Sequence, residues 1–152
     1  MNIDDRLKEL GLEIPVAAAP AAMYVPVKQT GNLLFISGQI PVKDGVMQYT
    51  GKAGKDKTLE EAQAAARLCA INIIAAVKGF TGNLDKVKSI VKITAFVASE
   101  TGFDKQHLVA NGASELLFDV FGEAGRHTRS AVAVNQLPLD ATVEVEAIVE
   151  VE

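Results

Sequence analysis

The stretch that follows Thr58 restricts the fold of this 152-residue chain more than any other feature. Thr58 and Glu61 form a capping-box pattern, in which each side chain binds a backbone amide at the start of a helix. Behind this cap, small or apolar residues recur at the helical period at positions 59, 62, 65, 66, 69, 73, 76 and 77. Much of this face is alanine, so we expect a helix that lies close against a sheet. It should run to about Lys78 and end at Gly79 or at Gly82.

Four further segments predict the strands of that sheet. The stretch 87–97 alternates apolar and polar residues, and 142–152 alternates valine with glutamate, as half-buried strands do. The runs 32–38 and 130–134 are short and apolar, which is typical of buried strands. Asp44 and Gly45 predict a hairpin turn between two of the shorter extended segments. Aromatic residues make up only 5% of the chain, so the core must consist mainly of Ala, Val, Ile and Leu.

Two more helices are expected. Residues 3–10 carry a short helical pattern that Gly11 stops. A longer helix is predicted from about Lys105 to Phe121, with Asp104 as its N-cap and Gly122 as its end.

The order of these elements indicates an α+β fold with a single domain over residues 1–152, in which two helices cover one face of a mixed sheet. Nothing in the sequence supplies elements for the other face of the sheet. The run 130–134 is nevertheless apolar on both sides, so it needs a cover there. We therefore expect a second subunit to pack on that face.

Composition and motifs exclude several classes of protein. The net charge is −4 and the Lys and Arg residues are scattered, which disfavours nucleic-acid binding. Cys69 is the only cysteine, so no intrachain disulfide is possible, and its apolar helical surroundings favour a buried core residue. We expect no metal and no cofactor, because His107 and His127 lack companions at metal-ligand spacing and no phosphate-binding loop is present. No apolar stretch approaches the length of a membrane span and the N-terminus has no signal-type run, so a cytoplasmic protein without a membrane partner is expected.

Two groups of residues could carry chemistry. Arg126, His127 and Arg129 precede an apolar strand, where a guanidinium can hold a ligand carboxylate through two parallel hydrogen bonds. An ordinary surface arginine is the more common case for such a pattern. The glutamates of the last strand, at 144, 146, 150 and 152, should share one face. Most of them fit a solvated face, but a partly buried one would have a raised pKa and could accept a proton from water. The period alone does not say which one.

Three segments, in order, resemble the Rid (reactive intermediate deaminase) family, also called YjgF-type or L-PSP proteins. They are APAAMY, which contains Tyr24, then GNLLFISGQIPV (31–42), and RSAVAVNQLPLDATVEVEAIV (129–149). The likeness extends over nearly the whole chain from about Ala19, and the last segment is the most specific.

The resemblance implies a chorismate-mutase-like (bacillus-type) fold assembled as a homotrimer with a central β-barrel and with sites between subunits. It also implies a hydrolytic deaminase that converts small enamines and imines, of the 2-iminobutanoate and 2-iminopropanoate type, to 2-keto acids and ammonia. Arg129 would bind the substrate carboxylate, assisted by the backbone amides near Ser37 and Gly38. Glu144 would orient or deprotonate the attacking water, and Tyr24 of the neighbouring subunit would line the pocket.

The chain departs from the family pattern at several positions. His127 and Thr128 stand where Pro-Ala is usual before the arginine, and Ala131 stands where cysteine is common. The chain is also longer, with an N-terminal helical extension (1–15) and a basic loop (51–57) that we expect to be flexible. Two alternatives to the deaminase therefore remain: a non-catalytic protein that binds small carboxylates on the same scaffold, and, less favoured by the acidic composition, an endoribonuclease.

Overall fold

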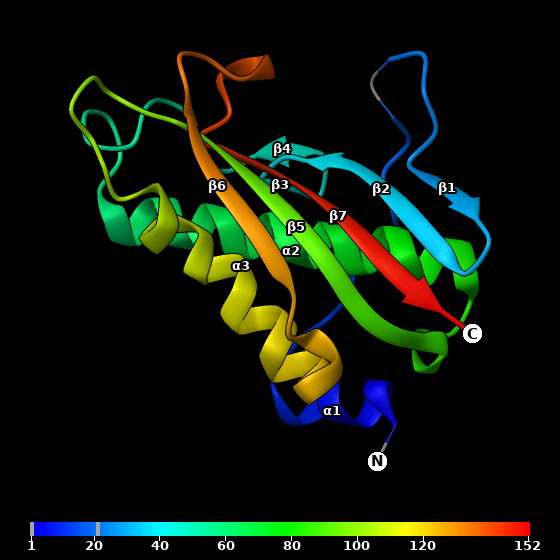
Figure 1. The fold of residues 1–152 in the computed structure, drawn as a ribbon. Helices are drawn as coiled ribbons and strands as arrows, with labels where there is room; N and C mark the ends of the chain where they lie inside the picture. Colours follow the sequence, from blue (N-terminus) through cyan, green and yellow to red (C-terminus); the bar gives the residue numbers. More distant parts are fainter. Residues whose placement is uncertain (1, 21) are drawn as a thin grey trace.

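The computed structural model describes residues 2–20 and 22–152. One five-stranded sheet forms its centre, with the strand order β1-β2-β7-β5-β6 (Figure 1). The strands are β1 (Val27–Thr30), β2 (Leu33–Gln39), β5 (Val87–Ala98), β6 (Thr128–Val134) and β7 (Val143–Val151). Neighbouring strands are antiparallel except β5 and β6, which are parallel, so the sheet is mixed as predicted.

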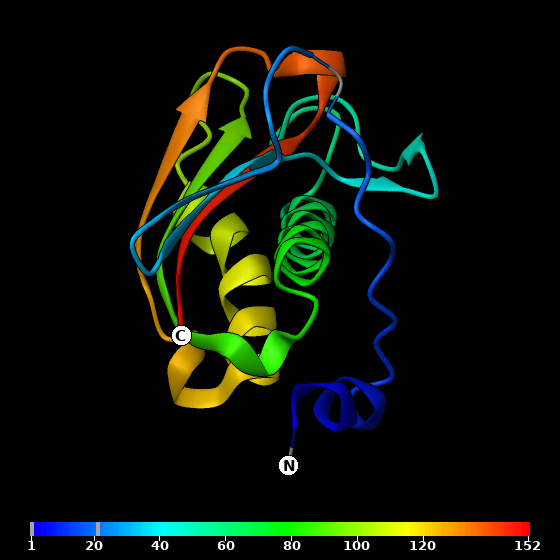
Figure 2. The same cartoon turned by 90° about the vertical axis from the view of Figure 1, so that its right-hand side faces the viewer.

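The two long helices, α2 (Leu59–Thr81) and α3 (Gln106–Phe121), lie on one face of this sheet, and its other face is left open (Figure 2). A short hairpin of β3 (Val42–Lys43) and β4 (Val46–Met47) precedes α2, and Asp44 and Gly45 form its turn with positive φ angles. The short helix α1 (Ile3–Glu9) lies at the C-terminal end of α3. Single turns at Leu84–Lys86, Gly122–Gly125 and Pro138–Asp140 complete the fold.

Helix α2 begins as its sequence predicts, because Thr58 accepts from the Glu61 amide and Glu61 accepts from the Thr58 amide. Its end was predicted less well. The helix continues through Gly79 to Thr81 and stops where Gly82 adopts a left-handed conformation, which glycine tolerates without a steric penalty.

The length of α2 corrects one expectation from the sequence. With 23 residues and a mean hydropathy of 1.4, α2 is long and apolar enough to cross a membrane. It is instead a helix of the core, because its alanine face lies between the sheet and α3, and half of its apolar stretch is buried. A core that contains few aromatic residues needs a helix of this kind, since small side chains bury apolar surface by close approach.

Three other expectations differ from the structure. Strand β1 was not predicted, because its sequence VKQT contains one buried residue, Val27, and gives no apolar period. Asp104 does not cap α3; the N-cap position is Lys105, and no side chain binds the first-turn amides. The loop 51–57 is partly built into the core, since Ala53 is fully buried and bridges to Ser99.

The open face of the sheet carries exposed apolar side chains. Phe35 is 42% exposed on β2 and Val132 is 43% exposed on β6. Strand β6, whose sequence is apolar on both sides, is an edge strand with one flank unpaired in a single chain. The exposed apolar side chains and the unpaired edge agree with the prediction that a second copy covers this surface. A single chain does not test that prediction.

We expect opposite effects on stability from two glycine-to-alanine substitutions in the long helices. A Cβ at Gly112 of α3 would lie 2.0 Å from the backbone oxygen of Gln63 on α2, so Gly112→Ala must push the helices apart. A Cβ at Gly79 of α2 would meet only the Ala17 Cβ, at an ordinary 3.5 Å. Chemical denaturation should show a loss of about 1–3 kcal/mol for Gly112→Ala. Gly79→Ala should gain up to about 1 kcal/mol from helix propensity. Equal effects of the two substitutions would contradict the close helix contact.

Candidate functional site

Arg129 lies at the start of β6, on the edge of the sheet that α3 accompanies. It pairs with the fully buried Ile93 of β5, so its side chain projects to the helix-covered face. There Nη1 donates to Oδ1 of Asn111 at 2.8 Å and to Oγ of Ser114 at 3.0 Å. Nη2 donates to the backbone oxygen of His107 at 2.8 Å. One flank of α3 therefore fixes the orientation of the guanidinium.

These three bonds leave part of the guanidinium available. An arginine has five N–H donors, and within residues 2–20 and 22–152 the Nε–H and one Nη2–H of Arg129 have no partner. In a guanidinium, Nε–H lies on the same edge of the plane as one of the two Nη2–H groups. A pair of parallel donors of this kind matches the two oxygens of a carboxylate. Helix α3 therefore holds the guanidinium mainly through Nη1, and two N–H donors are left for a ligand.

A cleft of about 410 Å³ opens beside Arg129, between α3 and the entry to β6. It is lined by Ser114, Glu115, Phe118, Asp119, Gly125, Arg126, His127 and Arg129. The second arginine of this lining is engaged elsewhere. Arg126 lies over the ring of Phe118 at 4.9 Å and forms an exposed ion pair with Glu123. Arg129 is thus the arginine of this lining that α3 holds through three hydrogen bonds.

His127 is joined to the same network. Its Nδ1 lies 2.6 Å from the backbone oxygen of Gly125, and its Nε2 lies 2.9 Å from Oγ of Ser114. A carbonyl can only accept, so Nδ1 carries the proton in neutral His127 and Nε2 accepts from the Ser114 hydroxyl. Burial lowers the pKa of His127, the bond to Gly125 raises it, and the charge of Arg129 lowers it further. The net lowering keeps the ring neutral near pH 7.

The other site residues expected from the sequence gather around the end of β2. Glu144 of β7 is half-buried there, and a Cβ on Gly38 would lie 2.6 Å from its Oε1, so only glycine leaves this carboxylate its place. The Ser37 hydroxyl donates to the backbone oxygen of Val25 at 2.7 Å, and its amide donates to that of Pro26. Tyr24, one residue before Val25, is 50% exposed. In a single chain the Ser37 amide is therefore not free for a ligand.

Glu144 differs from the other glutamates of β7. Burial raises its pKa, and the charge of Glu146 raises it further. A carboxylate with a raised pKa is a stronger base, which suits it to accept a proton from water near neutral pH. The burial of this one glutamate was not visible in the valine–glutamate alternation.

One chain does not bring Arg129 and Glu144 together. Glu144 pairs with Phe96 of β5, and Phe96 pairs with Val132, three residues beyond Arg129 on β6. At about 3.3 Å per residue and 4.8 Å per strand, the two Cα atoms are roughly 14 Å apart. Glu144 also lies between the buried Val143 and Val145, so it points to the open face, opposite to Arg129. The two groups lie on different faces of the sheet.

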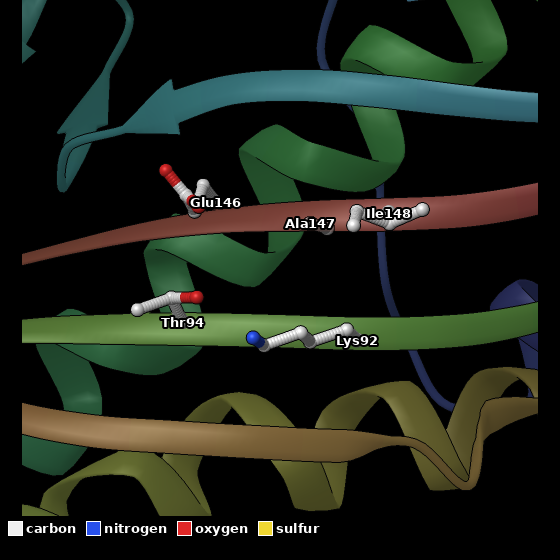
Figure 3. Close-up of a pocket in the computed structure, with 5 residues that line it drawn as sticks. All are labelled: Lys92, Thr94, Glu146, Ala147 and Ile148. Carbon is white, nitrogen blue, oxygen red and sulfur yellow. The ribbon is translucent and has the colours of Figure 1, made fainter. Parts of the chain in front are cut away.

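A small cavity, of about 60 Å³, lies on the open face. Lys92 and Thr94 of β5 line it together with Glu146, Ala147 and Ile148 of β7 (Figure 3). This hollow is too small for a metabolite. No group of three His, Cys, Asp or Glu side chains that could hold a metal ion occurs within the described residues.

Sequence reasoning missed the residues that orient Arg129. His107, Asn111 and Ser114 are spaced i, i+4 and i+7, so they form one stripe along α3. A signal was present for two of them, since Asn111 and Ser114 lie on one side of the helix that precedes the arginine-bearing strand. His107 binds through its backbone oxygen, which no side-chain pattern indicates.

Comparisons with known proteins agree with the resemblance noted in the sequence. The sequence profile of the family described as "YjgF/chorismate_mutase-like, putative endoribonuclease" matches residues 4–151. Protein TCP17 of Trypanosoma cruzi is 48% identical over 145 residues, which cover 95% of this chain and 91% of that protein. The 2-iminobutanoate/2-iminopropanoate deaminase of Escherichia coli K12 is 36% identical over 132 residues, which cover 86% of this chain and 90% of the deaminase.

Solved structures divide into two levels of similarity. A Shewanella oneidensis protein described as a putative endoribonuclease is 34% identical and superposes with a TM-score of 0.96 over 99% of this chain and 100% of that one. Escherichia coli TdcF with bound serine is 29% identical, with a TM-score of 0.66 over 90% of this chain and 94% of that one. The two sequence identities are similar, but the first backbone superposes on this chain much better than the second.

Replacing Glu144 by glutamine should stabilise the protein at neutral pH. The folded-state pKa of Glu144 is raised, so the protonated form favours folding and this stability is lost as the pH rises through the raised pKa. Glutamine mimics the protonated form. We expect Glu144→Gln to melt at a higher temperature than the native chain at pH 7.5, and the difference to vanish near about pH 4, where the native carboxyl is protonated. Glu152→Gln, at the exposed chain end, is the control, and an equal gain there would contradict the burial argument.

Proposed function

The chain belongs to the YjgF/chorismate-mutase-like family, and from that premise we propose that it is a hydrolytic deaminase of small carboxylated imines and enamines. Its products are the corresponding 2-keto acids and ammonia. The observation that carries this proposal is the guanidinium of Arg129, which α3 holds at one end while two parallel donors stay free at the edge of a cleft. The substrates of such a deaminase all carry a carboxylate beside the C=N bond.

The proposed chemistry needs positioning and one base. Arg129 binds the carboxylate and fixes the imine carbon, which is already electrophilic, next to a water molecule. Glu144 accepts a proton from this water as the oxygen attacks the imine carbon, and the imine nitrogen takes up a proton. Glu144 then gives its proton to the amine nitrogen, the C–N bond breaks, and ammonia leaves. The hydroxyl oxygen forms the C=O bond and releases its own proton to solvent, which replaces the proton that the imine nitrogen took up from solvent. An enamine enters this sequence after it tautomerises to the imine.

Arg129 and Glu144 can act on one substrate only if two copies share the site. We propose that the edge of one chain that carries Arg129 meets the end of β2 of a second chain, with its Glu144, Gly38 and Tyr24. A homotrimer whose open sheet faces form a central barrel would satisfy this requirement and would cover Phe35 and Val132. Support comes from the exposed apolar residues of the open face and from the unpaired edge of β6.

The separation of the two residues also supports a second candidate, a non-catalytic protein that binds small carboxylates. The Arg129 cleft is formed within one chain, where Glu115 and Asp119 belong to its lining and Glu144 lies on the other face of the sheet. This candidate requires carboxylate binding without turnover. An endoribonuclease, the activity in the family description and in the name of the Shewanella oneidensis protein, is less favoured, because the net charge is −4 and Arg126 is paired with Glu123.

Ammonia release from freshly generated 2-aminoacrylate tests the deaminase. We expect Arg129→Ala to lose turnover by at least about 100-fold, because the buried end of the site then lacks its only carboxylate donor pair. Arg126→Ala is the matched control and should keep the native rate, since that side chain is turned onto Phe118 and Glu123. If the native protein releases ammonia no faster than buffer does, yet binds 2-keto acids, the non-catalytic binding protein is the better candidate. Equal turnover of Arg129→Ala and the native protein, both faster than in buffer, would exclude Arg129 as the carboxylate-binding residue.

Mixing two inactive variants tests whether the site is shared between copies. Arg129→Ala and Glu144→Gln should each be inactive alone. After unfolding and refolding together in equal amounts, about a quarter of the shared sites should hold both native residues in a cyclic assembly. Partial return of ammonia release is therefore expected. A mixture as inactive as its components would show that the two residues do not meet across an interface.

A further inference from the structure

The Ser114–His127 pair lies next to the proposed carboxylate donors, and the mechanism above does not use it. We propose that Ser114 and His127 are positioning residues of this site, where His127 fixes the Ser114 hydroxyl and Ser114 in turn fixes the guanidinium of Arg129. This inference rests on the proposed role of Arg129 as the carboxylate-binding residue. It adds a chain of three side chains, from Gly125 through His127 and Ser114 to Arg129, that sets the direction of the free donors.

The need for His127 follows from where Ser114 lies. A serine in the middle of a helix normally turns its hydroxyl back to the carbonyl of the preceding turn. Here the Oγ of Ser114 lies 2.9 Å from Nε2 of His127 and accepts from Nη1 of Arg129 at 3.0 Å. The hydroxyl proton thus goes to the ring and a lone pair faces the arginine. Without an acceptor at Nε2, the hydroxyl would regain its bond within the helix and move away from Arg129.

His127 is itself held in the orientation that this requires. Its Nδ1 donates to the backbone oxygen of Gly125, at 2.6 Å, which places the acceptor nitrogen toward α3. Gly125 must lie close to α3 for this, and a Cβ there would be 2.2 Å from the backbone oxygen of Leu117. The burial that lowers the pKa of His127 keeps the ring neutral, so Nε2 stays an acceptor at neutral pH.

The same arrangement gives a physical reason for His127, one of the residues at which this chain departs from the family pattern. A proline at position 127, which is usual there, has no acceptor to offer Ser114. His127 and Ser114 come from segments 13 residues apart and meet only because the turn after α3 reverses the chain beneath the helix. The pair therefore forms only in the folded chain, and it determines how rigidly the guanidinium of Arg129 keeps its orientation.

The test is a double-mutant cycle on ligand binding. Calorimetric titration with 2-oxobutanoate at pH 7.5 gives Kd for the native protein, Ser114→Ala, His127→Phe and the double variant. We expect each single variant to bind about 5–10-fold more weakly, the effect of losing one hydrogen bond of ordinary strength. The double variant should bind no more weakly than either single one, because both substitutions break the same chain of bonds. Losses that multiply in the double variant would overturn the inference.

Conservative variants separate positioning from a general effect on the fold. Ser114→Thr keeps a hydroxyl and His127→Gln keeps an acceptor near Nε2, so both should restore binding to within about twofold of the native Kd. Ser130→Ala, on the opposite side of β6, is the matched control and should bind as the native protein does. If turnover is detected, Ser114→Ala should raise KM and leave kcat nearly unchanged. Failure of both conservative variants to restore binding would overturn the positioning role.

Arg129→Ala in the same titration distinguishes the two proposals. If Arg129→Ala binds 2-oxobutanoate as the native protein does, the carboxylate site is elsewhere and the proposed function fails together with this inference. If Arg129→Ala abolishes binding while Ser114→Ala and His127→Phe bind normally, the carboxylate site stands and the positioning role alone is overturned.

Discussion

The close contact between α2 and α3 is the constraint on which the rest of the structure depends. Gly112 brings the backbone of α3 against the Gln63 carbonyl of α2, and the Gln63 side chain donates to the backbone oxygen of Leu108 at 2.9 Å. The alanines of α2 allow the same closeness to the sheet. Because α3 is fixed in this way, its polar stripe meets the first residues of β6, and the position of Arg129 follows from the packing of the two helices.

Most of the fold could be predicted from the sequence because its long elements carry a clear period and clear ends. The capping box at Thr58, the alternation in β5 and β7, and the stop at Gly122 are local signals, and each led to the observed element. Strand β1 carries no such signal, since it is held by its pairing with β2 and not by its own pattern. The same holds for Ala53, which looks like part of a polar loop and is buried by contacts with a distant segment.

The candidate site was predicted in its parts and not in its arrangement. The family resemblance pointed to Arg129 and Glu144, and their roles stay predictions. Their placement on opposite faces depends on strand order and register, which no local pattern encodes. The partners of Arg129 were missed for a related reason. Asn111 and Ser114 matter because the turn at Gly125 brings β6 beneath α3, and that proximity is a tertiary fact. The family resemblance thus indicated which residues to consider, and the structure showed that Arg129 and Glu144 of one chain lie apart.

The comparison of structures bears on how far function can be carried from relatives to this chain. Two solved structures with sequence identities of 34% and 29% differ in TM-score, 0.96 against 0.66, so sequence identity in this family does not measure how similar the backbones are. A carboxylate site depends on distances of a few tenths of an ångström, which backbone agreement at the lower level does not guarantee. The proposed carboxylate ligand therefore depends on the bonds that hold Arg129 in this chain. Those bonds come from α3, where Asn111 and Ser114 bind the guanidinium.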